Sequence, residues 1–193
     1  IRKSLVGSEM CIRDRFGDVT LRIEPLEAGS GLVFESEITG ATLPTEYYGP
    51  VEQGFKEAAQ SGVVAGHPVV DIKAILIDGS HHEVDSSEVA FKIASSMAFK
   101  EACQKASPFI LEPVMLMEVV TPEEFLGDVL GDLQSRRAQV QSMEPQAGLQ
   151  IVKAHVPLAE TFQYATILRS NTTGRASFTQ ELDHYAPAPM KDK

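Results

Sequence analysis

The chain has 193 residues, of which 43% are hydrophobic and 23% are charged, and these values are typical of globular proteins. They exclude fibrous, collagen-like and wholly disordered chains, and no stretch approaches the roughly 20 apolar residues of a membrane span. Two cysteines, Cys11 and Cys103, are too few for a disulfide framework and lack the spacing of a metal site. We therefore expect a reducing, cytoplasmic setting, with Cys103 packed as a small apolar side chain.

The net charge is −10, and the acidic residues are concentrated in the first half of the chain. Residues 16–113 contain 6 basic and 15 acidic residues, whereas residues 114–193 contain 7 and 10. This balance argues against a broad basic face for non-specific duplex binding. The charge balance does not exclude local contacts to RNA.

Residues 1–15, IRKSLVGSEMCIRDR, show neither a helical nor a strand periodicity. They begin without Met and lack the apolar core of a signal peptide. Part of this run resembles the translation of a sequencing adapter joined to a truncated reading frame. We interpret residues 1–15 as a non-native leader, with a genuine N-terminal arm as the alternative. On this interpretation the protein proper begins near Phe16, and its first sheet lacks an edge strand.

The first half of the chain predicts three strands and a helix. Alternation of apolar and polar residues from Gly17 onward, and again over 32–38, predicts two half-buried strands. Pro50 suits the first turn of a helix that ends at Gly62. The apolar run 69–77 then predicts a buried strand.

A long helix follows, with Asp85 expected as its N-cap and a glutamate three residues later in a capping-box pattern. Its apolar face is expected along Val89, Ile93 and Met97, with the neighbouring alanines beside them. The helix should end near Lys105.

The second half of the chain predicts the order strand, helix, strand, strand, helix, strand. The strands are expected over 114–120, 138–143, 149–156 and 176–182, and residues 121–124, TPEE, supply an N-cap, a first-turn proline and an N3 glutamate. The residues expected on the buried faces of the two helices are Phe125, Val129, Leu133, Leu158, Phe162, Ala165 and Leu168.

These elements indicate an α+β protein of two domains that join near Glu112. Residues 16–112 would form an α/β sandwich, and residues 113–187 a ferredoxin-like domain of order β-α-β-β-α-β. Residues 188–193 would be a tail.

Motifs for catalysis are not found in the sequence. It contains no G-x-x-x-x-G-K-[ST] nucleotide loop, no G-x-S-x-G elbow and no H-E-x-x-H helix. The most unusual cluster, residues 81–85 (HHEVD), fits a metal or acid–base site, an exposed loop without chemistry, or a recognition tip. We favour recognition, because adjacent histidines do not easily share one ion, whereas imidazoles can stack on bases or donate to phosphate and ribose oxygens.

The second domain also has a set of basic side chains. Such side chains are either solvated surface charges or, where one face gathers them, phosphate contacts. They are Arg136, Arg137, Lys153, Arg169 and Arg175.

Several long motifs resemble bacterial translation elongation factor G, and the similarity covers essentially all of residues 16–190. The longest is 79–88, GSHHEVDSSE. The others are 43–47 (LPTEY), 66–71 (GHPVVD), 111–115 (LEPVM), 121–124 (TPEE), 127–133 (GDVLGDL), 157–160 (PLAE), 164–170 (YATILRS) and 174–178 (GRASF).

The resemblance implies that the two domains are the fourth and fifth of that family. The fourth would be related to a ribosomal-protein fold with a left-handed β-α-β crossover, and its tip would enter the decoding-side A site of the ribosome. There it would contact transfer RNA and messenger RNA, with the family's histidine at His82 and with Phe16, Gly17 and Asp18 as the remnant of a companion loop. The expected tip loop is Ser80, His81, His82, Glu83, Val84, Asp85 and Ser86.

The resemblance further implies that the five basic residues contact large-subunit ribosomal RNA. The chain itself would be neither an enzyme nor a metal or cofactor binder, since GTP and magnesium would bind a separate GTPase domain of a monomeric parent protein. The expected partner is the ribosome, not a membrane. Two alternatives stay open: a paralogue for ribosome recycling or tetracycline resistance, and a stand-alone metalloenzyme built on His81, His82, Glu83 and Asp85.

Overall fold

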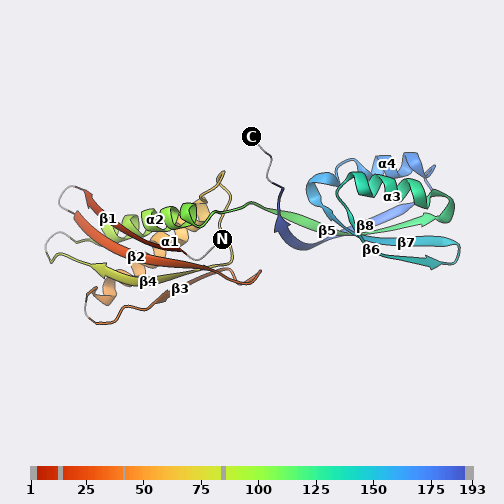
Figure 1. Cartoon of the computed structure of the whole chain (residues 1–193). Coiled ribbons are helices and arrows are strands. Elements are labelled where there is room, and N and C mark those ends of the chain that lie inside the picture. Colours follow the sequence, from red (N-terminus) through yellow and green to blue (C-terminus); the bar gives the residue numbers. More distant parts are fainter. Residues whose placement is uncertain (1–3, 13–14, 41, 84–85, 190–193) are drawn as a thin grey trace. The chain divides into compact units, whose positions relative to one another are not determined.

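A computed structural model describes residues 4–12, 15–40, 42–83 and 86–189 (Figure 1). The chain divides after Ile110 into two compact units, whereas the expected joint lay after Glu112. Each unit is described by itself. The expected tip residues Val84 and Asp85 lie outside the described residues, as do 1–3 and 13–14 of the expected leader and 190–193 of the expected tail.

The first unit has a four-stranded sheet in the order β1-β2-β4-β3. β1 (Ser4–Ile12), β2 (Arg15–Pro25) and β4 (Ile72–Ser80) are antiparallel neighbours, and β3 (Leu32–Ser36) is parallel to β4. The chain passes from β3 to β4 through η1 (Thr45–Tyr47) and α1 (Tyr48–Ser61), and α2 (Glu88–Lys105) follows β4. This arrangement contains the expected β-α-β unit. The left-handedness of its crossover stays a prediction.

The strand β1 corrects the expectation that residues 1–15 have no regular structure. It pairs with β2 residue by residue, from Ser4 opposite Ile23 to Ile12 opposite Arg15. β2 is therefore an interior strand, and the edge expected to be unpaired is filled. The strand could not be foreseen because SLVGSEMCI does not alternate, and backbone pairing alone defines it. The non-native origin of residues 1–15 stays a prediction.

Both helices of the first unit cover the same face of its sheet. The alternating pattern predicted for β2 is confirmed, since Val19, Leu21 and Ile23 are fully buried. They meet phenylalanines from both helices, of which Phe55 and Phe99 pack edge to face with 5.0 Å between ring centroids.

β4 begins three residues later than the apolar run predicted. Asp71 adopts a positive φ of 57°, and its carboxylate accepts the N–H of Gly31 at 2.9 Å. The Ile72 N–H in turn donates to the Gly31 carbonyl. Residues 69–71 therefore lie outside the strand, with a bend at Asp71, in spite of their apolar character.

The helix α2 differs from its prediction at its cap and in its buried face. Ser87, not Asp85, is the N-cap, because its Oγ accepts the N–H of Ala90 at 3.2 Å. The predicted stripe Val89, Ile93 and Met97 is 38–50% exposed. The helix does bury the alanines predicted beside that stripe (Ala90, Ala94 and Ala98), together with Phe91, Ser95, Phe99, Ala102 and Cys103.

Close packing of α1 on α2 explains why α2 does not bury the predicted stripe. A Cβ at Gly54 of α1 would lie only 2.1 Å from the carbonyl oxygen of Lys92, so this contact requires glycine. Phe91 and Phe99 then fill the interior, where both rings are fully buried. Cys103 is buried as predicted, and burial raises the pKa of its thiol to about 12.

The second unit has the element order β5-α3-β6-β7-α4-β8 and an antiparallel sheet in the order β6-β7-β5-β8, which confirms the ferredoxin-like prediction. No helix in the described part of either unit is long and apolar enough to cross a membrane. The elements are β5 (Leu111–Pro122), η2 (Glu123–Phe125), α3 (Leu126–Ser135), β6 (Gln139–Gln146), β7 (Leu149–Pro157), η3 (Leu158–Glu160), α4 (Tyr164–Asn171) and β8 (Ser177–Pro187).

One expected N-cap and one expected buried residue of the second unit are wrong. Thr121 is buried and its hydroxyl bonds the Pro122 carbonyl at 3.3 Å, so it caps no helix. Phe162 is exposed because Gln163 adopts a positive φ of 61°, which separates Phe162 from α4. Tyr164 is buried instead, against Phe178.

Gly54→Ala is expected to destabilise the first unit by roughly 1–3 kcal/mol, because the added methyl group must force α1 away from α2. Gly49→Ala is the matched control, since it lies in the same helix with nothing within 4 Å of an added Cβ. Urea unfolding followed by circular dichroism measures both. Equal destabilisation of the two variants would contradict the close contact.

Candidate nucleic-acid interface

The expected tip residues come together where β2 begins and β4 ends, at one end of the first unit (Figure 1). Asp18 of β2 is paired with Ser80 of β4, and the Ser80 hydroxyl donates to the Asp18 carboxylate at 3.0 Å. Phe16 forms a bridge to Ser86 on the far side of the loop. We call Phe16–Asp18, Ser80–Glu83 and Ser86 the tip. Phe16, Gly17 and Asp18 belong to a strand here, not to a loop.

Two glycines allow the backbones at the tip to approach closely. A Cβ at Gly17 would lie 3.0 Å from the carbonyl carbon of Ala90, in the first turn of α2. A Cβ at Gly79 would lie 2.9 Å from the carbonyl oxygen of Asp18. β2 is therefore held against α2 on one side and against the end of β4 on the other.

The loop after β4 is closed by two hydrogen bonds between the same residues. The His82 N–H donates to Ser86 Oγ at 2.9 Å, and the Ser86 N–H donates to the His82 carbonyl at 3.1 Å. This closure holds His82 next to the start of α2.

The two histidines of the tip face different neighbours. The exposed His82 ring meets Phe16 edge to face, with 4.1 Å between ring centroids. His81 is partly buried, with Nδ1 3.4 Å from the Thr42 carbonyl and its ring 6.3 Å from that of Tyr47. The sequence did not single out Tyr47 as a site residue, although it lies in the LPTEY motif. Because the two rings contact different neighbours, one ion shared by both histidines is disfavoured.

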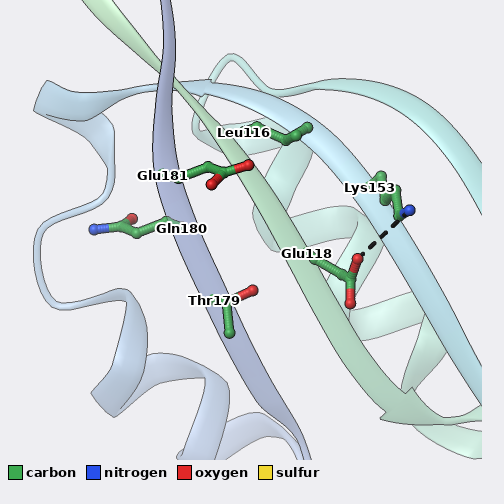
Figure 2. Close-up of a pocket in the computed structure, with 6 residues that line it drawn as sticks. All are labelled: Leu116, Glu118, Lys153, Thr179, Gln180 and Glu181. Atoms are coloured by element: carbon green, nitrogen blue, oxygen red, sulfur yellow. Dashed lines mark ion pairs between the residues drawn. The ribbon is translucent and has the colours of Figure 1, made fainter.

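The five basic residues of the second unit do not share one face. Lys153 projects from β7, on the sheet face opposite the helices, and pairs with Glu118 at 3.6 Å (Figure 2). Arg175 pairs with Glu124 and lies over the Phe125 ring. Arg169 of α4 is exposed and makes no ion pair with the residues that the structure describes.

Arg136 and Arg137, which follow α3, both bind partners within the unit. Arg136 is largely buried: it pairs with Asp132 at 2.8 Å, donates to the Glu160 carbonyl at 2.5 Å and lies over the Tyr164 ring. Arg137 binds both carboxylate oxygens of Glu112, which raises the pKa of the guanidinium. Few donors of Arg136 are left for a phosphate.

Comparison with known families matches two consecutive stretches. The family model for elongation factor G, domain IV, matches residues 6–107, which is more than half of the chain. The chain belongs to the elongation factor G family. A second model, for the elongation factor G C-terminus, matches residues 109–193. The first match begins inside the stretch interpreted as a leader, and neither model is that of a GTPase domain.

A crystal structure of a protein from Thermus thermophilus is similar over 97% of this chain, with 44% identity and a TM-score of 0.81. This chain spans 28% of the length of that protein. The resemblance to elongation factor G is therefore confirmed, and the two α+β units match the family's fourth and fifth domains.

Ser86→Ala is expected to loosen the tip, because the His82 N–H loses its acceptor. One neutral hydrogen bond contributes about 1 kcal/mol, so amide exchange at His82 should accelerate roughly 5-fold. Hydrogen exchange by NMR measures this, with amides of the β2–β4 ladder as internal controls. Unchanged exchange at His82 would show that Ser86 does not close the loop.

Arg136→Met is expected to destabilise the second unit by about 1–3 kcal/mol, since the Asp132 carboxylate and the Glu160 carbonyl lose their donor. Arg169→Met, on the exposed side of α4, should change stability by less than about 0.5 kcal/mol. Thermal unfolding of both variants tests the difference. If Arg136→Met were as stable as Arg169→Met, its internal contacts would contribute nothing.

Proposed function

We propose that this chain is the part of a translational GTPase that contacts transfer RNA and messenger RNA in the decoding-side A site during translocation. The observation that carries the proposal is the exposed His82 imidazole, backed by Phe16 at the end of the β2–β4 ladder. Membership of the elongation factor G family supports it.

His82 has the exposure and the support that a recognition residue needs. Its ring makes no hydrogen bond within the residues that the structure describes, so its nitrogens stay available to ribose, phosphate or base edges. The aromatic contact with Phe16 and the closed loop limit its movement. A ligand would therefore bind an already ordered side chain at a small entropic cost.

The charge around the tip favours selectivity over general affinity for RNA. Asp18 and Glu83 belong to the tip, and the chain as a whole is strongly acidic. These carboxylates repel phosphates, so RNA would bind only where its shape presents a groove to the tip.

The second unit would contact large-subunit ribosomal RNA. Arg169 suits this role best because it is exposed, whereas Arg137, Lys153 and Arg175 would have to exchange a carboxylate partner for a phosphate. The parent protein would be a cytoplasmic, monomeric GTP hydrolase, with GTP and magnesium in its own GTPase domain. Neither GTP nor magnesium is expected to bind this chain.

His82→Ala, in a full-length factor that carries this chain, is expected to slow translocation while ribosome-stimulated GTP hydrolysis stays near normal. Single-turnover translocation and phosphate release measure the two steps. His67→Ala is the matched control, since His67 is exposed in the same unit away from the tip. A parallel fall in hydrolysis would contradict the role of the tip. Absence of translocation in both versions would favour a recycling factor.

A further inference from the structure

Three polar side chains with metal-ligand chemistry meet on the open sheet face of the second unit. They are His155 of β7 and Asp183 and His184 of β8, and one ligand atom from each lies within 4.8 Å of the others. The strand order places β5 between β7 and β8, so the cluster reaches across a strand. It lies far from the tip in sequence, and nothing in the proposed function uses it.

An irregularity in the β5–β8 ladder explains how two successive residues of β8 join one cluster. Val114 is opposite His184 and Met115 is opposite Leu182, which leaves Asp183 as the extra residue of a bulge. In a regular strand, neighbouring side chains point to opposite faces. The bulge breaks this alternation, so Asp183 and His184 both reach His155.

One distance in the cluster is close to that between two ligands of a zinc site. His155 Nε2 lies 3.4 Å from Asp183 Oδ2, and ligands at zinc's usual 2.0–2.1 Å are about 3.3 Å apart in a tetrahedron. His184 Nδ1 lies 2.5 Å from the same oxygen, so this pair must open slightly. The rings are edge to face, with 5.2 Å between centroids. Two imidazoles thus flank one carboxylate.

The surroundings of the cluster favour binding of a solvent-accessible cation. The side chains of His155, Asp183 and His184 are 25%, 37% and 46% exposed. The same sheet face carries a shallow depression lined in part by Glu118 and Glu181, with Lys153 as its basic residue (Figure 2). Carboxylates therefore outnumber the one lysine around this cluster, and their potential attracts a divalent ion.

We propose that His155, Asp183 and His184 bind a divalent transition metal ion, with zinc as the reference ion and water completing its coordination. Histidine and carboxylate ligands select zinc and its neighbours over calcium or magnesium, which prefer oxygen ligands alone. The bound ion links β7 to β8 across β5. Because it binds the folded unit, it stabilises that unit by an amount that rises with the logarithm of the free zinc concentration above Kd.

The test is calorimetric titration of the untagged full chain with zinc chloride. We expect one zinc per chain and at least a 10-fold weaker affinity in His155→Gln and in His184→Gln. Both side chains are partly exposed, so both variants should fold, and circular dichroism checks this. The matched controls are His67→Gln and His82→Gln in the first unit, which should bind zinc as the parent does.

A second measurement locates the ion independently of affinity. In NMR spectra of the imidazole groups, zinc should shift the signals of His155 and His184 and leave that of His67 unchanged. Absence of zinc binding, binding that survives both cluster substitutions, or binding lost in His82→Gln would each overturn the proposal. The last result would place the ion at the tip instead.

Discussion

The position of the tip depends on how closely three backbones approach one another. β2 passes against the first turn of α2 at Gly17, and it meets the end of β4 where Gly79 faces Asp18. A side chain at either position would push two of these elements apart. Because the loop that carries His82 spans from β4 to α2, its place depends on both contacts. Glycine at these two positions therefore permits the close packing that positions the tip.

The hydrophobic pattern of the sequence predicted the elements whose structure is determined by burial of an apolar face. The alternation along Val19, Leu21 and Ile23 identified β2, and the ferredoxin-like order followed from six such elements. The pattern failed where contact with a neighbouring element determines the local structure. Ser87 and Asp85 are equally good caps by type, and the buried face of α2 is set by the contact at Gly54. β1 could not be found because its defining feature is backbone pairing with β2.

Residue type and the family resemblance predicted only part of the candidate site. Both indicated the loop around His82, but neither indicated that His81 would turn toward Thr42. Residue type also grouped Arg136 with Arg169, although the first is enclosed by its partners and the second is exposed. The cluster of His155 with Asp183 was beyond sequence reasoning, since it requires both the strand order and a bulge.

The two units show how a neighbour decides what an imidazole can do. At the tip, the Phe16 ring supports His82 through an apolar contact that leaves its nitrogens to an outside ligand. On the open sheet face, the Asp183 carboxylate lies beside both His155 and His184, where it aligns the rings and attracts positive charge. The first arrangement suits hydrogen bonding to RNA, and the second suits a metal ion. The same side chain therefore supports recognition or coordination according to the residue packed against it.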